Sequence, residues 1–159
     1  MTVIRRNPVN RLGKLMATPG GISVAKALAD ASANLASIRG DCLPLMDEKI
    51  AEVQAIVARC KAGPSQADLK RLYGLGNEIL EIGGAFDMKD LSEAAFSLCD
   101  LIDRFVTFKR YSWAALQVHL DGLIALRAAA GEQNPHTATV LIGLKQVCET
   151  IKGEASAEA

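Results

Sequence analysis

The sequence predicts an all-α protein, an up-down four-helix bundle with additional N- and C-terminal helices. Half of the 159 residues are hydrophobic but only 4% are aromatic, and Ala and Leu dominate the apolar residues. Helices favour Ala and Leu, whereas strands prefer β-branched and aromatic side chains. Apolar residues also recur at intervals of three and four. Short turn segments separate the periodic stretches, as in bundles of antiparallel neighbours.

The length is that of one domain with a substantial core. Residues 1–21 have no sustained period, end in Pro-Gly-Gly and are basic, so we expect a flexible arm. Residues 22–152 form the predicted helical-bundle domain. Residues 153–159, GEASAEA, are small and acidic and predict a disordered tail. The basic residues of the arm are Arg5, Arg6, Arg11 and Lys14.

The first helix is predicted over residues 23–39. Ser23 can cap its N-terminus, and Gly40 can provide the left-handed residue that ends it. Asp41 can then cap a second helix, in which Pro44 is tolerated in the first turn. The apolar positions of the two helices are Val24, Ala27, Leu28, Ala31, Leu35, Ile38, Met46, Ile50, Val53, Val57 and Cys60.

Gly63-Pro64 ends the second helix, and Ser65 with Asp68 predicts a capping box that opens the third. Asp87 is the expected N-cap of the fourth helix. The apolar face of the third helix contains Leu69, Leu72, Gly76, Ile79, Gly83 and Phe86, and that of the fourth contains Leu91, Ala94, Leu98, Leu101 and Phe105.

Near Tyr111 and Ser112 the chain either turns or bends without ending the helix. A fifth helix then runs from Trp113 to a stop at Gly131, and Asn134-Pro135 starts a sixth. Because the connections are short, the second to fifth helices are expected to form the bundle, with the first and sixth packed outside it or at its ends.

The stretch 76–95, GNEILEIGGAFDMKDLSEAA, resembles the centre of a histidine phosphotransfer domain, a four-helix bundle. The match keeps the packing half of the motif: Gly76, Ile79, Gly83, Gly84, Ala85, Phe86, Asp87, Leu91 and Ala95. The chemical half is changed. Asn77 stands where the family has its phosphorylated histidine, Leu80 replaces a lysine and Glu81 replaces a glycine. A carboxamide nitrogen is not nucleophilic at neutral pH, so the resemblance implies a phosphotransfer fold without its phosphoacceptor.

The same residues also fit an ordinary helical hairpin. Glycine inside a helix costs about 1 kcal/mol relative to alanine, and Gly76, Gly83 and Gly84 could serve close approach of the two backbones. A second stretch, LGKLMATPGGISVAKAL, is similar to small accessory proteins of alphaproteobacterial chemotaxis clusters of the chemotaxis protein E type. That resemblance implies a role in signalling.

The two histidines are the remaining candidates for chemistry. His119 borders an apolar stripe, and two hypotheses are open for it. It is an unorthodox phosphoacceptor with Asp121 or Lys109 nearby, or a histidine hydrogen-bonded at the edge of the core. His136 falls in the first turn of the sixth helix, where we expect it to be solvated. Neither shows a serine or cysteine at the spacing of a catalytic dyad.

A partner-binding face is predicted around Tyr73, Asn77, Leu80 and Glu81, with Lys89 on the next helix. The first four share one helix face at intervals of three and four. An apolar Leu80 on that face could anchor a partner's helix. Alternatively, Leu80 only widens the buried stripe of the third helix.

Composition and motifs exclude several classes of function. Eighteen basic residues balance eighteen acidic ones, which argues against nucleic-acid and membrane partners. Four dispersed cysteines and two histidines predict no metal site, and no phosphate or dinucleotide loop predicts a cofactor. Without a signal-peptide core or a long apolar run, we expect a cytoplasmic protein with reduced cysteines.

The leading interpretation is a non-enzymatic module of two-component or chemotaxis signalling. It would bind a response-regulator receiver domain or a histidine kinase without accepting phosphate at Asn77. One alternative is an unorthodox histidine phosphotransferase that uses His119. Another is a structural or oligomerising helical protein with no link to signalling, and homodimerisation is left open.

Overall fold

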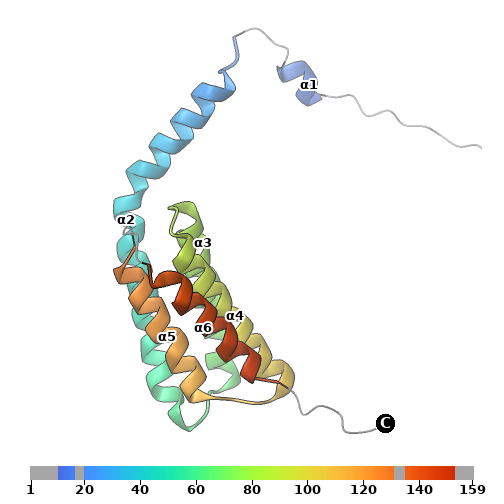
Figure 1. Cartoon of the computed structure of the whole chain (residues 1–159). Helices are drawn as coiled ribbons and strands as arrows, with labels where there is room; N and C mark the ends of the chain where they lie inside the picture. The colour runs from blue at the N-terminus through green and yellow to red at the C-terminus, as the bar shows by residue number, and fades with distance from the viewer. Residues whose placement is uncertain (1–10, 17–19, 131–134, 153–159) are drawn as a thin grey trace, which may run out of the picture. The chain divides into compact units, whose positions relative to one another are not determined.

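The computed structural model describes residues 11–16, 20–130 and 135–152, and within these residues the chain is helical without strands (Figure 1). Helix covers 85% of them, which confirms the predicted all-α class. The helices are α1 (Arg11–Met16), α2 (Val24–Arg59), α3 (Gln66–Ala85), α4 (Lys89–Phe108), α5 (Trp113–Ala128) and α6 (Thr137–Thr150), with a 3₁₀ turn at Cys60–Ala62.

The chain divides into two compact units, Met1–Ser37 and Ile38–Ala159. The predicted arm, residues 1–21, falls within the first of these units. The first unit contains α1, inside the segment predicted as an arm, and the first turns of α2. The residues of 11–36 whose burial the structure describes are exposed, except for the half-buried Ala27. Residues 1–10 of the arm and the tail 153–159 lie outside the described residues.

Helix α2 runs without interruption through Gly40 and Pro44, so the predicted stop at Gly40 and cap at Asp41 are wrong. Gly40 does not adopt a positive φ. Proline inside a helix costs about 3 kcal/mol, because it removes one hydrogen bond and its ring meets the carbonyl four residues earlier. That carbonyl belongs to Gly40.

Burial beyond the proline is what offsets this cost. Met46 and Val53 are fully buried and Ile50 nearly so, and each aliphatic side chain taken from water contributes about 1.5–3 kcal/mol. Helix α2 therefore continues past the proline, and its apolar residues from Met46 onward pack in the core of the second unit.

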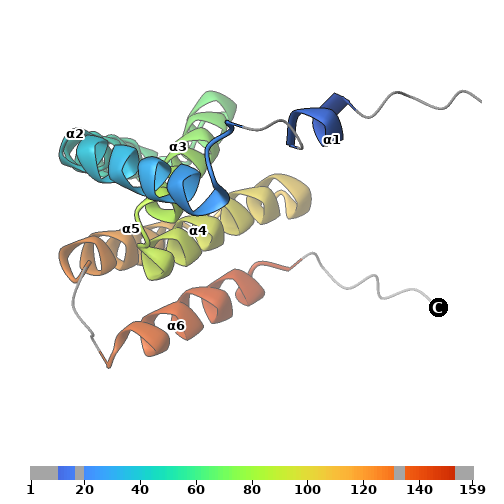
Figure 2. The same ribbon diagram turned by 90° about the horizontal axis from the view of Figure 1, so that it is seen from above.

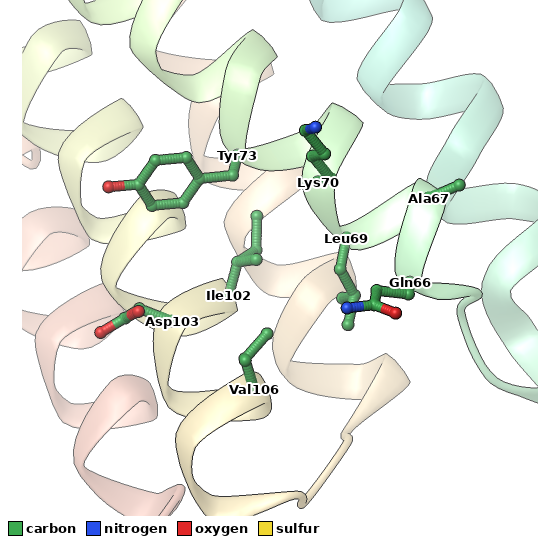
Figure 3. A pocket seen from close by; sticks show the side chains of 8 residues that line it. All are labelled: Gln66, Ala67, Leu69, Lys70, Tyr73, Ile102, Asp103 and Val106. Carbon is green, nitrogen blue, oxygen red and sulfur yellow. The ribbon is translucent and has the colours of Figure 1, made fainter.

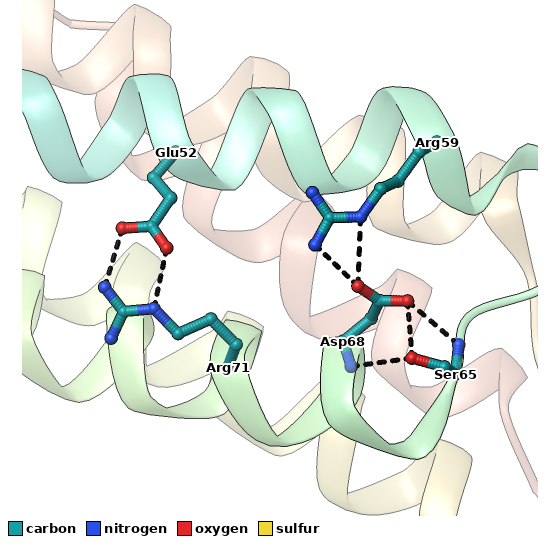
Figure 4. Close-up of polar contacts among 5 residues, drawn as sticks. All are labelled: Glu52, Arg59, Ser65, Asp68 and Arg71. Atoms are coloured by element: carbon teal, nitrogen blue, oxygen red, sulfur yellow. Dashed lines mark hydrogen bonds and ion pairs between the residues drawn. The ribbon is translucent and has the colours of Figure 1, made fainter.

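The start of α3 is the predicted capping box (Figure 4). The Asp68 amide donates to Ser65 Oγ at 3.1 Å, and the Ser65 amide donates to Asp68 Oδ2 at 3.1 Å. Arg59, at the end of α2, donates to Asp68 Oδ1 at 2.6 Å. The hydrogen bonds from Ser65, with those from Arg59, lower the pKa of Asp68 to about 2. This junction also holds α2 and α3 side by side, as does the two-pronged bond of Arg71 to Glu52.

The turn between α3 and α4 differs from its prediction. Asp87 has φ +59° and so lies in the left-handed region, and α4 begins after Met88 without a side-chain cap. The Met88 amide donates to the Gly83 carbonyl at 2.9 Å and closes the turn. Aspartate tolerates the left-handed conformation better than most residues, which explains its place in the turn rather than at the helix start.

Helix α4 is the centre of the second unit, since it packs against α3, α5 and α6. Of the two alternatives predicted near Tyr111, the turn is correct, because α4 ends before α5 begins. Lys109 is left-handed after the last residue of α4, and the Ala115 amide donates to Ser112 Oγ at the start of α5. Trp113 Nε1 donates to the Val57 carbonyl at 3.1 Å, which ties the start of α5 to α2. Helix α6 lies alongside α4 and α5 (Figure 2). The predicted signals at Gly131 and Asn134 fall outside the described residues.

Candidate functional site

Helices α3 and α4 approach each other closely at two glycines. A Cβ added at Gly76 would lie 2.6 Å from Cys99 Sγ, and one added at Gly83 would lie 2.5 Å from Ser92 Oγ. Both distances are shorter than real Cβ atoms show, so a side chain at either position would force Cys99 or Ser92 to move. Gly84, in contrast, has open space within 4 Å. Close packing therefore explains two of the three glycines, in a phosphotransfer domain and in an ordinary hairpin alike.

Asn77 follows the first of these glycines and is half-buried beside α4. The Cys99 thiol lies 3.8 Å from Asn77 Oδ1 and 3.6 Å from the Tyr73 carbonyl, and it donates toward both. Burial raises the pKa of Cys99 to about 11, so the sulfur keeps its proton as a donor. The position matching the phosphorylated histidine thus holds an amide that is oriented by a neutral thiol and has no nucleophilic atom.

A groove of about 640 Å³ opens one helical turn before Asn77, between α3 and α4 (Figure 3). Tyr73 and Val106 stand at its sides with 43% and 56% of their surface exposed. Lys70 and Asp103 place opposite charges on its rim, both exposed to solvent. The groove has the usual composition of a docking site, an apolar floor with a few polar groups at the edge. Its lining residues are Gln66, Ala67, Leu69, Lys70, Tyr73, Ile102, Asp103 and Val106.

The structure brings only part of the predicted partner face together. Tyr73 lines the groove, Asn77 lies one turn further along α3, and Glu81 is exposed one turn beyond that. Leu80 is half-buried and packs against the core, as expected if it widens the buried stripe. Lys89 is exposed at the first residue of α4, past the turn, so it stands at the far end of the face from Tyr73.

On α4, the sequence predicted only Lys89 for this face and missed Phe96, Asp103 and Val106. Phe96 is 64% exposed, and it shares a stripe at intervals of three and four with Cys99, Asp103 and Val106. Cys99 contacts Tyr73 and Asn77, so this stripe borders the α3 face. The sequence did carry a signal for this surface, because Phe96 and Val106 are large apolar residues that lie outside the buried seam of α4. We call the surface of Tyr73, Asn77, Phe96, Asp103 and Val106 the α3–α4 face.

His119 lies inside the protein, not at the edge of the core. Its side chain is 0% exposed. Nδ1 is 2.9 Å from the Ala115 carbonyl, which can only accept, so Nδ1 carries the proton. Nε2 is then an acceptor, 3.0 Å from Ser97 Oγ and 3.4 Å from Cys148 Sγ. Burial lowers the pKa of His119, and the ring is neutral.

This cluster joins α4, α5 and α6, and its members are 22 and 29 residues from His119 in sequence. No dyad was expected from local spacing, and no local signal points to these contacts. Burial raises the pKa of Cys148, whereas a nucleophilic cysteine needs a lowered pKa. The cluster therefore works as a satisfied buried polar network. Asp121, proposed as a neighbour of His119, is exposed and accepts a bond from Gln117 at 2.9 Å.

The described residues contain no group of three or more metal-binding side chains. Among the helices of the described part of the chain, none combines the length and the apolar character needed to cross a membrane. No family model, no curated protein and no solved structure matches this chain.

Proposed function

We propose that this chain is a non-catalytic signalling module, a phosphotransfer-like bundle that docks a response-regulator receiver domain or a histidine kinase. The docking surface is the α3–α4 face. The observation that carries this proposal is the position of Asn77, which Cys99 contacts and which lies one helical turn along α3 from Tyr73 in the apolar groove. The face has the apolar groups of a binding surface, and the position that matches the family's phosphorylated histidine holds Asn77.

The chemistry around Asn77 supports docking without phosphoryl transfer. Phosphoryl transfer to a side chain needs a nucleophile and a cation that steadies the phosphoryl group. Asn77 supplies no nucleophile, and Leu80 turns toward the core instead of offering a cation. Glu81 is exposed on the next turn, where its carboxylate repels a phosphoryl dianion.

The proposed arrangement is an up-down bundle of the second half of α2 with α3, α4 and α5, with α6 outside it, in a cytoplasmic protein. Bonds between α2 and both α3 and α5 support it, through Arg71 with Glu52 and through Trp113 with the Val57 carbonyl. In this bundle α3 and α4 present one continuous surface, which is the geometry that a docking partner requires.

Phosphorylation of His119 is the less favoured alternative, because its ring is fully buried with both nitrogens engaged. A partner's aspartyl phosphate would have to reach a nitrogen that Ser97 and Cys148 cover. That requires the α4–α6 contact to open first.

The test begins with capture of partners from a lysate of the source organism, followed by titration of each recovered receiver or kinase domain against the purified chain. Tyr73→Ala with Val106→Ala removes apolar groups from the groove and is expected to weaken binding at least about tenfold. Val118→Ala with Ile142→Ala is the matched control, since both side chains are exposed on α5 and α6. This control is expected to change the affinity less than about twofold.

Three outcomes would contradict the proposal. The first is equal weakening by the groove and control variants, and the second is no binding to any receiver or kinase. The third is acid-labile phosphate on the chain after incubation with a phosphorylated receiver. Loss of that phosphate in His119→Gln would establish the phosphotransferase alternative.

A further inference from the structure

Helix α6 lies at one edge of the second unit, against α4 and α5 (Figure 2). It buries three residues, fewer than α2, α3, α4 or α5, each of which buries at least five. They are Leu141, Leu144 and Cys148, and Ile151 is buried just after the helix ends. Local opening of a protein begins where few apolar contacts hold an element. Helix α6 is therefore the helix of the second unit that costs least to detach.

The polar contacts that connect the outer side of α6 to its neighbours are exposed to solvent. Lys145 pairs with Glu93 of α4 at 3.9 Å, and Arg110, between α4 and α5, donates to the Lys152 carbonyl at 2.9 Å. Exposed contacts of this kind add little to stability. A groove of about 400 Å³ also opens between α5 and α6, so the two helices are not packed together along their whole length.

The inner side of α6 covers the buried histidine of α5. Cys148 Sγ lies 3.4 Å from His119 Nε2 and donates to the Ser97 carbonyl of α4 at 3.4 Å. Because Nδ1 already carries a proton toward the Ala115 carbonyl, Nε2 is the nitrogen that would take up a second one. Helix α6 thus stands between water and the one atom of the ring that can be protonated.

A second proton would turn the enclosed ring into a cation. Ser97 Oγ, 3.0 Å from Nε2, could accept a hydrogen bond from that cation, so hydrogen bonding survives. What is lost is hydration, because a charge away from water costs far more than a neutral ring. Protonation and enclosure of His119 therefore oppose each other.

The charged groups near the ring do not remove this conflict. Burial lowers the pKa of His119, and the opposing effects of the Ala115 carbonyl and of Asp100 on α4 are smaller. Asp100 is itself engaged by Arg104, which donates to Oδ2 at 2.9 Å. On α6 the facing titratable group is Cys148, whose pKa is raised by burial, so its thiol stays neutral and offers the cation no counter-charge.

We propose that acid releases α6: uptake of a proton by His119 detaches α6 from α4 and α5, while the other helices of the second unit stay folded. Release lets water reach the imidazole and so removes the cost of enclosing its charge. The open state becomes populated as the pH falls through about 6.5, the ordinary pKa of a hydrated histidine, and the closed state returns above it. This inference does not depend on the proposed function, because neither His119 nor α6 belongs to the α3–α4 face.

The experiment measures how often Cys148 becomes accessible in the full-length chain, with Cys99 in the α3–α4 seam as the reference. Both thiols are labelled with a low concentration of 4,4′-dithiodipyridine at about pH 7.5 and about pH 5.5, and the labelled peptides are quantified by mass spectrometry. Each rate is divided by the rate of the same cysteine in urea-unfolded chain at the same pH. This opening ratio cancels the effect of pH on the thiol itself.

The opening ratio of Cys148 is expected to rise about five- to tenfold between the two pH values, as the titration of one histidine dictates. At the lower pH it should exceed the opening ratio of Cys99 at least about tenfold, because α6 opens without global unfolding. Equal ratios for Cys148 and Cys99 would show that only global unfolding exposes Cys148 and would overturn the proposal. A rise of less than about twofold for Cys148 would overturn it as well.

Two variants identify the histidine responsible. His119→Gln keeps a polar side chain that does not titrate, and it should make the opening ratio of Cys148 independent of pH. His136→Gln is the matched control, since His136 is the only other histidine and lies at the N-cap of α6, where a positive charge disfavours the helix. It should respond to acid like the wild type. A response that persists in His119→Gln, or disappears in His136→Gln, contradicts the proposal. If circular dichroism shows His119→Gln unfolded, the wild type and His136→Gln decide between the outcomes.

Discussion

Replacing Gly76 by alanine tests whether α3 and α4 touch as closely as the structure indicates. In an open helix interior, Gly→Ala stabilises by about 0.5–1 kcal/mol. At Gly76 the new Cβ would lie 2.6 Å from Cys99 Sγ and 3.4 Å from the Ala95 carbonyl. Overpacking of this kind costs about 1–3 kcal/mol. The net expectation is a loss of about 1 kcal/mol, or a midpoint lower by roughly 4 °C.

Gly74→Ala is the matched control on the same helix, because nothing lies within 4 Å of a Cβ there. It is expected to stabilise by about 0.5–1 kcal/mol. The two substitutions have identical chemistry, two residues apart, and should change stability with opposite signs. The assay is urea unfolding of the full chain, followed by circular dichroism at constant temperature.

A double-mutant cycle identifies the atom responsible. In a Cys99→Ala background the nearest obstacle to the new methyl group is gone, and the Ala95 carbonyl at 3.4 Å is the next. Gly76→Ala should then be neutral or stabilising. The interaction free energy between the two substitutions is therefore expected to stabilise the double variant by about 1–2 kcal/mol relative to the sum of the single variants. If Gly76→Ala in the wild-type background stabilises as much as Gly74→Ala, the close approach of the two helices is refuted.

Two further predictions concern the buried titratable groups. Because burial lowers the pKa of His119, the unfolded chain takes up a proton below pH about 6.5 while the folded chain does not. Stability should therefore be full above that pH and fall as the pH drops below it, at no more than about 1.4 kcal/mol per pH unit. His119→Gln should flatten this dependence in urea titrations between pH 5 and 7, and an unchanged slope would contradict it. Cys42 is the least buried of the four cysteines, so iodoacetamide should alkylate it first in the native protein. Mass spectrometry that finds Cys99 or Cys148 modified before Cys42 would contradict the packing of α4 against α3 and α6.

Features set by neighbours in sequence were predictable. The capping box of Ser65 and Asp68 is correct because the four residues from 65 to 68 contain both partners of each bond. The apolar seams of α3 and α4 are correct because helical period alone places their residues on one face. Tyr73 and Asn77 were placed on one helix face by the same rule, which is the extent to which the candidate site could be predicted.

Features set by packing between distant segments could not be predicted from the sequence. Gly40 and Asp41 are a plausible helix end, but Met46 and the apolar residues after it are buried on the same helix, and that burial outweighs the local signal. Asp87 looks like an N-cap, yet the bond from the Met88 amide to the Gly83 carbonyl places it in a left-handed turn. Phe96 and Val106 belong to the α3–α4 face only because α4 lies against Tyr73.

The sequence by itself determined the helical class, most helix boundaries within the second unit and the absence of a histidine at position 77, because composition, period and residue identity are local properties. Only the tertiary structure decided that His119 is enclosed by Ser97 and Cys148 and that Tyr73, one helical turn from Asn77, lines a groove between α3 and α4. These outcomes depend on which helices pack together, and burial of apolar surface between distant segments makes that choice.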